Sequence, residues 1–203
     1  MLTFYHSPQT RSTRILALLR DLGALEHVTV KTVTIPRQDG SGQRDPANPH
    51  PEGKVPLLDH DGTLIWETTA IALYLTDLFP EAGLGPRIGE PERGAYLSWL
   101  AWYGAVLEPV YILHNAGLSH PWVTAAIRGV PEAAERLTAA FADGRPWLLG
   151  ESYSAADLIL HSPFAFFPDS APEDARVRDW IARCMARPAY RWAWERDAAA
   201  LAA

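Results

Sequence analysis

Hydrophobic and polar residues follow two different periods near the N-terminus. Residues 2–5 (LTFY) form a short apolar run of strand-forming residues, and residues 28–35 (VTVKTVTI) alternate β-branched apolar with polar side chains. Between these runs, from about residue 11 to residue 22, apolar residues recur at helical spacing, and Gly23 follows where a helix is expected to end. The chain is therefore predicted to begin with a strand, a helix and a second strand.

A hairpin and a helix are predicted after a polar loop that spans residues 36–53. Two short apolar runs flank Asp61-Gly62, a dipeptide typical of tight turns between antiparallel strands. An apolar helical pattern then runs from about Thr68 to Phe79 and stops before a proline. A parallel βαβ unit followed by an antiparallel pair and a closing helix is the order of a thioredoxin-like α/β domain, which we place at residues 1–80.

Helical periodicity dominates the rest of the chain. Residues 81–92 are dense in glycine and proline, which is typical of a linker. The patterns beyond this stretch predict no strand, and they indicate an all-α helical bundle domain at residues 87–203. The helices are expected at about residues 92–118, 121–143, 154–166, 173–186 and 188–200.

Composition argues against several classes of function. The formal net charge of −6 argues against nucleic acid as the main partner, and no apolar run is long enough to span a membrane. The N-terminus lacks the basic start and apolar stretch of a secretory signal, and Cys184 is the only cysteine, so a cytoplasmic, reducing environment is expected. The seven histidines show no metal-ligand spacing, so no metal site is predicted.

The most specific pattern lies between Asn48 and Leu75, in the segment NPHPEGKVPLLDHDGTLIWETTAIALYL. It contains an Asn-Pro pair, a short loop, a Gly-Lys-Val-Pro-Leu-Leu run, a hairpin turn and a Glu-Thr pair at the start of a helix. This order resembles the glutathione-site segment of the glutathione S-transferase family, which usually has serine where this chain has Thr68. A second segment, LLGESYSAADLIL at residues 148–160, is similar to the capping segment of that family's helical domain.

The second segment also carries a capping pattern of its own. Ser154 is followed three residues later by Asp157 and then by an apolar run, so the two residues are expected to cap a helix through reciprocal hydrogen bonds. Asp157 is therefore predicted to serve folding rather than catalysis.

The resemblance implies a site for glutathione as a co-substrate. It implies a cis Val55–Pro56 bond, with the backbone of Val55 pairing with the cysteinyl main chain of glutathione as an added strand would. It also implies that Glu67 and Thr68 hold the γ-glutamyl end, because the free N–H groups of a helix start attract a carboxylate. Taken alone, those two residues better suit a simple helix cap. Lys54 either reaches the glycine carboxylate of glutathione or remains a solvated loop residue.

The sequence leaves several candidates for the group that would activate the thiol. The family uses a Tyr, Ser or Cys near the first strand and helix, and the absence of cysteine there excludes a cysteine mechanism. The candidates, in order, are Ser12, Thr10, Arg11 as an electrostatic donor, and Tyr5. The last of these also suits a packed position in a strand.

By resemblance, the chain is expected to be a homodimeric glutathione S-transferase that joins the glutathione thiolate to a small apolar electrophile. The electrophile pocket is expected to include Trp102, Tyr103 and Val106, although helical spacing also suits these residues to a bundle core. Two alternatives stay open. One is a glutathione-dependent isomerase, reductase or dehalogenase on the same fold, and the other is a non-catalytic glutathione-binding regulatory protein.

Overall fold

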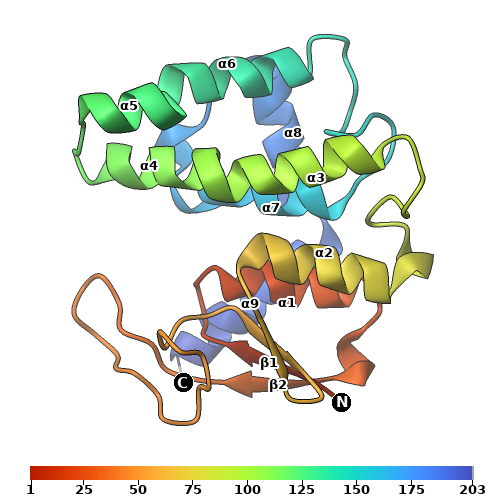
Figure 1. Ribbon diagram of the computed structural model, residues 1–203, viewed down its shortest axis with the longest axis vertical. Helices are drawn as coiled ribbons and strands as arrows, with labels where there is room; N and C mark the ends of the chain where they lie inside the picture. The colour runs from red at the N-terminus through yellow and green to blue at the C-terminus, as the bar shows by residue number, and fades with distance from the viewer. Residues whose placement is uncertain (203) are drawn as a thin grey trace. The chain divides into compact units, whose positions relative to one another are not determined.

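The computed structural model describes residues 1–202, and over that range the chain divides into two compact units (Figure 1). The first unit contains Met1–Ala82 and the C-terminal helix α9 (Pro188–Ala202). The second unit contains Gly83–Arg187. Each unit has its own set of fully buried apolar side chains.

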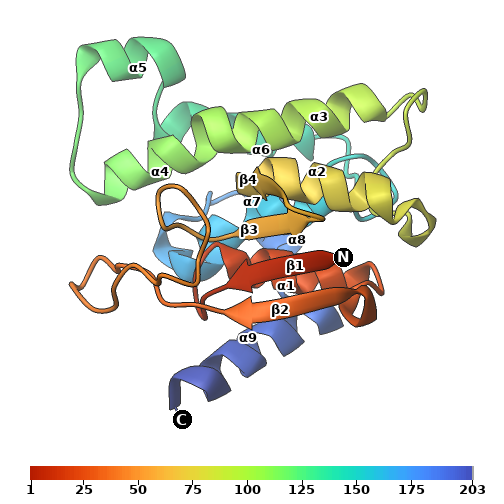
Figure 2. The same ribbon diagram turned by 60° about the horizontal axis from the view of Figure 1, so that its bottom comes forward.

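The first unit is built on a mixed sheet. Its strands are paired in the order β2-β1-β3-β4, with β1 parallel to β2 and antiparallel to β3 (Figure 2). Within the described residues this sheet has four strands: β1 (Leu2–His6), β2 (Val28–Thr32), β3 (Leu57–His60) and β4 (Thr63–Trp66). The order confirms the thioredoxin-like arrangement predicted from the pattern.

The helices and turns of the first unit start and stop at the expected signals. Helix α1 (Ser12–Asp21) ends where Gly23 adopts a φ of 66° and donates its N–H to the carbonyl of Arg20. At the hairpin, Asp61 and Gly62 both have positive φ, 51° and 86°, which matches the twist of the paired strands. The remaining elements here are α2 (Thr68–Leu78) and two short 3-10 turns, η1 (Leu25–His27) and η2 (Pro80–Ala82).

Helix α9 packs against α1. The guanidinium of Arg20 in α1 lies over the indole ring of Trp192 in α9, 4.6 Å from the ring centroid. The observed division therefore differs from the expected boundaries of 1–80 and 87–203, because the last helix joins the α/β unit. Helical periodicity predicts that such a helix forms, but it does not say which surface the helix covers.

Apolar residues of α1 and the central strands form the core of the first unit. Ile15, Leu16 and Leu19 of α1 are fully buried, as are Phe4 in β1 and Leu57 in β3. Burial of a side chain of this size contributes about 1.5–3 kcal/mol to stability. This core holds the end of β1 and the starts of α1 and α2, where the candidate catalytic residues and the Glu67-Thr68 pair lie.

The second unit is helical, as predicted. Its elements are α3 (Arg93–Trp102), the π-helical turn η3 (Tyr103–Leu107), α4 (Glu108–Asn115), α5 (Pro121–Ile127), α6 (Val130–Ala140), α7 (Ala155–Phe166), the 3-10 turn η4 (Pro168–Ser170) and α8 (Ala175–Met185). The helix expected at 92–118 is interrupted by η3, because Pro109 has no N–H to donate to the carbonyl four residues earlier. The helix expected at 121–143 is divided at Arg128, whose φ is 65°.

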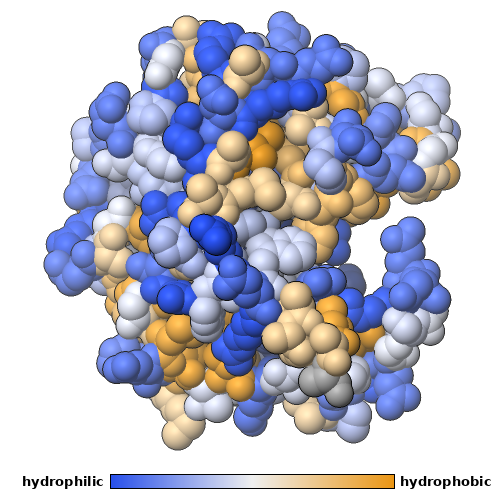
Figure 3. Space-filling model, turned by 180° about the vertical axis from the view of Figure 1, so that it is seen from behind, coloured by the Kyte–Doolittle hydropathy of each residue, from blue (hydrophilic) through white to orange (hydrophobic). Residues whose placement is uncertain are grey.

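The surface mixes polar and apolar side chains. Blue hydrophilic areas alternate with orange apolar patches on the face drawn in Figure 3. Single exposed apolar residues such as Trp122 and Ile88 are ordinary for a folded protein. Within residues 1–202, no helix has both the length and the apolar character needed to cross a lipid bilayer.

Candidate functional site

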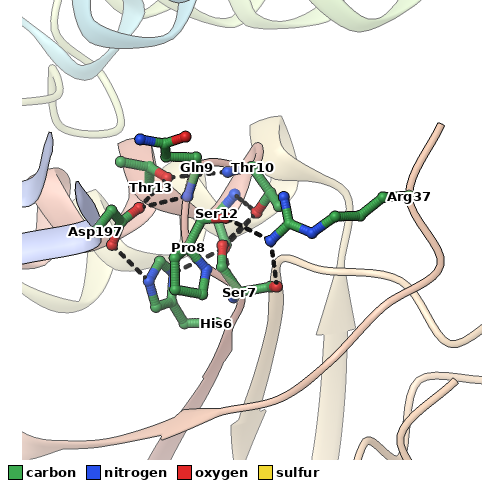
Figure 4. A network of polar contacts seen from close by, with 9 residues as sticks. All are labelled: His6, Ser7, Pro8, Gln9, Thr10, Ser12, Thr13, Arg37 and Asp197. Carbon is green, nitrogen blue, oxygen red and sulfur yellow. Dashed lines mark hydrogen bonds and ion pairs between the residues drawn. The ribbon is translucent and has the colours of Figure 1, made fainter. Parts of the chain in front are cut away.

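The loop between β1 and α1 brings most of the predicted catalytic residues together. Figure 4 shows Ser12 surrounded by His6, Ser7 and Thr10. The Oγ of Ser12 lies 2.8 Å from His6 Nδ1 and 2.8 Å from Thr10 Oγ1, and it accepts the N–H of Ser7 at 3.0 Å. Because Ser12 is 0% exposed, its hydroxyl cannot touch a ligand while the loop keeps this conformation. This burial argues against Ser12, the first candidate, as the group in direct contact with a thiol.

Thr10 is the candidate hydroxyl that lies closer to the surface. Its side chain is half-buried, and its Oγ1 donates to the carbonyl of Ser7 at 2.7 Å. The same oxygen accepts the N–H of Ser12 at 3.2 Å. A ligand that approached this loop would therefore meet the hydroxyl of Thr10 before that of Ser12.

The other two catalytic candidates lie in different surroundings. Arg11 is exposed and occupies the N-cap of α1, so its charge stands beside the start of that helix. Tyr5 is buried in a core cluster with Val33 and Leu57, and Lys31 lies over its ring at 5.6 Å from the centroid. Tyr5 thus occupies the packed strand position that the sequence also allowed.

Asp197 of α9 supports the loop through three hydrogen bonds, and the sequence pattern does not predict this contact. Its Oδ1 lies 2.9 Å from His6 Nε2, while its Oδ2 accepts the N–H of Gln9 at 2.8 Å and the hydroxyl of Thr13 at 2.6 Å (Figure 4). Burial alone would raise the pKa of Asp197, but the hydrogen bonds from His6, Thr13 and Gln9 outweigh it and lower that pKa. No local pattern could reveal this contact, because it joins residues at opposite ends of the chain.

Arg37 holds the outer side of the same loop. It comes from the long loop after β2, and its Nη2 donates to the carbonyl of Pro8 at 2.8 Å (Figure 4). The same nitrogen lies 3.4 Å from Ser7 Oγ. The loop is therefore fixed from both sides, by Asp197 and by Arg37, before any ligand binds.

The Val55–Pro56 peptide bond, which the resemblance implies to be cis, is cis in the structure. Val55 is 8% exposed and lies just before β3. Asn48 Nδ2 donates to the carbonyl of Lys54 at 3.1 Å and so ties down the preceding loop. The side chain of Lys54 itself is exposed and forms an ion pair with Glu52.

The start of α2 has an unusual arrangement. Glu67 is exposed and occupies the N-cap with a φ of 66°, a conformation that is uncommon for a residue other than glycine. Among the described residues, the Glu67 side chain makes no capping hydrogen bond to the N–H groups of α2. Thr68 follows and is 7% exposed, and its Oγ1 accepts a hydrogen bond from Nη2 of the buried Arg14 at 3.2 Å. A buried cation beside uncapped helix N–H groups favours an anion at this point.

The three candidate pocket residues lie in and beside the π-helical turn η3. Tyr103 is 1% exposed and belongs to the core of the second unit. Trp102 and Val106 are half-buried, and the ring of Trp102 packs edge-on against Trp99 at 5.5 Å between centroids. Of the three, Trp102 and Val106 keep apolar surface available for a ligand.

Asp157 is a structural residue, as predicted. Together with Ser154 it forms a capping box at the start of α7. Its two oxygens accept the N–H groups of Leu148 and Ser154, the Ser154 hydroxyl and the indole N–H of Trp180, each at 2.9 Å. These bonds occupy the carboxylate fully, which leaves it no capacity for catalysis. Elsewhere within residues 1–202, no group of His, Cys, Asp and Glu side chains could hold a metal ion.

Comparisons with known proteins bear directly on this architecture. The family model described as "Glutathione S-transferase, N-terminal domain" matches residues 1–84. The disulfide-bond oxidoreductase YfcG of Escherichia coli is 30% identical over 166 residues, which cover 68% of this chain and 70% of that protein. The chain belongs to the glutathione S-transferase family. Its first 84 residues match the family's N-terminal domain.

Two other relatives are matched over smaller shares of their own length. Protein LigF of a Sphingobium species is 43% identical over 54 residues, 26% of this chain and 21% of that protein. Dichloromethane dehalogenase of Methylorubrum extorquens is 27% identical over 164 residues, 74% of this chain and 53% of that protein. The matched segments thus span about a fifth of protein LigF and about half of dichloromethane dehalogenase.

Solved glutathione S-transferases match the fold over nearly the whole chain. A glutathione transferase of Methylococcus capsulatus has a TM-score of 0.74 and 27% identity, covering 98% of this chain and 99% of its own. A sphingomonad glutathione S-transferase complexed with glutathione also has a TM-score of 0.74, with 25% identity, covering 97% of this chain and 98% of its own. The α/β unit and the helical unit therefore both follow the family's architecture.

Proposed function

We propose that this chain is a glutathione transferase, which binds glutathione on its α/β unit and directs the thiolate onto small apolar electrophiles. The start of α2 carries the proposal. There, uncapped N–H groups, the hydroxyl of Thr68 and the buried guanidinium of Arg14 converge on one point, as a site for a carboxylate requires. Glutathione, which is bound in the solved sphingomonad relative, offers such a carboxylate at its γ-glutamyl end.

The remaining binding residues fit the same peptide. Glu67 is exposed next to Thr68, so its carboxylate can pair with the γ-glutamyl ammonium group. The backbone of Val55, next to Pro56, is suited to pair with the cysteinyl main chain of glutathione like an added strand. Lys54 would have to leave Glu52 to reach the glycine carboxylate, and we therefore assign it a minor contribution to affinity.

For thiol activation we assign the direct contact to Thr10, whose hydroxyl hydrogen would turn from the Ser7 carbonyl to the sulfur. A hydroxyl that donates a hydrogen bond to sulfur stabilises the thiolate relative to the thiol and so lowers the pKa of the bound thiol. Arg11, exposed beside Thr10, supplies positive charge that acts in the same direction. The electrophile would contact the apolar surfaces of Trp102 and Val106, while the buried Tyr103 supports the helix that carries them.

The decisive experiment compares Thr10→Val with Thr10→Ser, using glutathione and a general aryl halide acceptor. Thr10→Val removes the hydroxyl and is expected to lower kcat by about 10- to 100-fold. Thr10→Ser keeps the hydroxyl and should retain most of the activity. Full activity in Thr10→Val would exclude Thr10 and leave Arg11→Gln as the next variant. Without turnover in the wild type, but with tight glutathione binding, the chain would be a binding protein.

Two relatives give specific reasons to test other reactions. The dichloromethane dehalogenase match suggests release of halide from small alkyl halides, and the YfcG match suggests reduction of disulfides by glutathione. Halide release or disulfide reduction faster than aryl transfer would replace the proposed reaction with one of these. An isomerase reaction would consume no glutathione, which an assay of total thiol detects.

We also propose that the protein acts as a homodimer in the cytoplasm, as the family resemblance implies. The native mass, measured by sedimentation equilibrium, should be twice the chain mass of 22.4 kDa. A native mass equal to one chain would contradict the dimer.

A further inference from the structure

A chain of buried polar groups leads from Thr10 into the protein, and thiol binding alone does not require it. Thr10 Oγ1 lies 2.8 Å from Ser12 Oγ, which lies 2.8 Å from His6 Nδ1. On the other side of the imidazole, His6 Nε2 lies 2.9 Å from Asp197 Oδ1. Four side chains from the loop, β1, α1 and α9 thus form one continuous line of hydrogen bonds (Figure 4).

This line runs through the interior. Ser12, Asp197 and His6 are 0%, 1% and 2% exposed, so water does not compete for their hydrogen bonds. Burying a histidine and an aspartate lowers the stability of a protein unless the two are paired, so their presence here asks for a role beyond bracing the loop. A serine, threonine or backbone group would brace the loop without placing a titratable ring beside a carboxylate.

Hydrogen-bond directions follow from Asp197. Its lowered pKa, which results from hydrogen bonds that outweigh burial, keeps it ionised at neutral pH, so it only accepts. His6 must therefore direct an N–H from Nε2 toward Asp197. In the neutral ring the other nitrogen, Nδ1, then carries a lone pair and can accept the hydroxyl proton of Ser12, for which the carbonyl of Ser7, 3.0 Å from Ser12 Oγ, is the alternative acceptor.

The charged surroundings of the ring are simple. Among the described residues, Asp197 from α9 is the charged group in contact with the His6 ring. From β2 the neutral Thr32 pairs with His6, and Lys31 lies over the ring of Tyr5, whose side chain points to the other face of the sheet. Arg37 contacts the outer side of the loop at Ser7 and Pro8.

We propose that His6 accepts the proton that the glutathione thiol gives up, through the hydroxyls of Thr10 and Ser12, and that Asp197 holds the charged imidazole. The inference rests on the proposed function, because it needs glutathione at Thr10. It assigns a use to His6 and Asp197, which act through other residues and are positioning residues rather than groups that touch the substrate.

The proton moves in three linked transfers. The S–H bond breaks and its proton goes to Thr10 Oγ1. The original Thr10 proton turns from the Ser7 carbonyl and passes to Ser12 Oγ, and the Ser12 proton passes to His6 Nδ1. Both hydroxyls regain what they lose, so the net products are a thiolate and an imidazolium, with no change in total charge and no electron transfer. After the transfer His6 donates to Ser12, Ser12 donates to Thr10, and Thr10 donates to the sulfur. Each hydrogen bond of the line therefore points toward the thiolate.

A purely structural brace and a proton acceptor predict different behaviour of the His6 ring. The full chain labelled with nitrogen-15 in its histidines is titrated with glutathione at neutral pH, and the His6→Gln variant identifies the His6 signals. S-methylglutathione is the control ligand, because it has the same peptide but no thiol proton. Glutathione, but not S-methylglutathione, should shift the His6 ring nitrogens to their imidazolium values while thiolate absorbance appears.

Proton counting gives a second readout. Calorimetry in buffers of different ionisation enthalpy should show thiolate formation in the wild type without release of a proton to the buffer. Release of one proton per thiolate, or a His6 ring that stays neutral while thiolate absorbance appears, would overturn the relay and leave glutathione binding intact. Absence of binding for both ligands would instead overturn the proposed function, and the relay with it.

Asp197→Asn tests the direction of the relay with almost no change in shape. Its amide N–H would face His6 Nε2, so the ring would carry its hydrogen on Nδ1 and could not accept a proton from Ser12. S-methylglutathione affinity should hold within about twofold, while the pH at which the thiolate forms rises by about one unit. Ser12→Ala breaks the line at another residue and should give the same shift, so the inference fails if both variants form thiolate at the wild-type pH.

Discussion

Two helix starts in this molecule use the same kinds of residue in opposite ways. At α7, the Ser154 hydroxyl and the Asp157 carboxylate turn toward one another, and the carboxylate also takes the indole N–H of Trp180. At α2, the acid is Glu67, which lies at the N-cap itself, exposed and with a φ of 66°. The hydroxyl of Thr68 there contacts the buried guanidinium of Arg14.

The difference lies in where the acid stands relative to the hydroxyl. Three residues after the N-cap, as in α7, a carboxylate folds back onto the free N–H groups and satisfies them within the protein. One residue before the hydroxyl, as in α2, it cannot do so, and the helix start is left with positive potential. A capped start therefore contributes to folding, whereas an uncapped start beside a buried cation suits a ligand. Substitutions at α7 should change stability, and those at α2 should change binding.

The largest effect is expected from Asp157→Ala. The substitution removes the acceptor of four hydrogen bonds and leaves the buried donors unpaired, so it should lower the free energy of unfolding by about 3–5 kcal/mol. Urea denaturation measures this loss. Glutathione affinity per folded molecule should stay unchanged.

Asp174→Ala is the matched control for Asp157→Ala. Asp174 also caps a helix, α8, and accepts the N–H groups of Arg176 and Val177, but it is only half-buried. Its loss should be much smaller, since water can replace the missing acceptor. Equal losses for the two variants would show that burial of the Asp157 cluster does not set its contribution.

The sequence predicted the α7 cap and the start of α2 because both depend on neighbours along the chain, whereas the binding role at α2 is implied by the family resemblance and stays a prediction. Ser154 and Asp157 are three residues apart, and Glu67 and Thr68 are adjacent at the end of a hairpin that its turn residues identify. The thioredoxin-like strand order followed from the same local signals. Local information was sufficient wherever one segment satisfied its own hydrogen bonds.

The sequence could not predict contacts that join distant segments. Asp197 meets His6 across 191 positions of the chain, and its helix shows only helical spacing, which says nothing about its partner. The same limit put Ser12 ahead of Thr10, because a hydroxyl's burial depends on how His6 and Asp197 close the loop. The family resemblance pointed to the loop, while packing decided which hydroxyl lies nearer the surface.

A smaller effect, on binding rather than stability, is expected from Thr68→Val. Valine keeps the shape but lacks the hydroxyl that would face the γ-glutamyl carboxylate, so glutathione affinity should fall by about 1–3 kcal/mol. Calorimetry measures the affinity. Thr69→Val, at the half-buried neighbour, should bind as the wild type does. Unchanged affinity in Thr68→Val would remove the α2 start from the site.

Ser154→Ala should have a smaller effect still, and on the opposite property. It removes one hydroxyl from the α7 cap, but the backbone N–H of Ser154 still donates to Asp157, so the expected loss of stability is about 1 kcal/mol. The thermal midpoint measures this loss, and glutathione affinity should not change. A weaker affinity would mean that the two helix starts are not separate in function.

The smallest effects are expected on acidification, which should change the contributions of the two buried carboxylates to stability in opposite directions. The pKa of Asp197 is lowered in the folded protein, so its stabilising contribution is present above the ordinary value of 3.8 and is lost as the pH falls through the folded pKa. Burial raises the pKa of Asp157, even against four hydrogen bonds. Its contribution is therefore largest below 3.8 and is lost as the pH rises through the folded pKa.

Asn variants of each residue isolate these contributions, because the pH dependence of every other group cancels in the difference from wild type. Urea denaturation at neutral pH and just below pH 3.8 gives the two differences. The destabilisation caused by Asp197→Asn should shrink on acidification, because the wild type loses its ionised carboxylate. The destabilisation caused by Asp157→Asn should grow, because a protonated Asp157 no longer opposes its burial. If acidification changed the destabilisation in the same direction for both variants, the opposite pKa shifts of Asp197 and Asp157 would be contradicted.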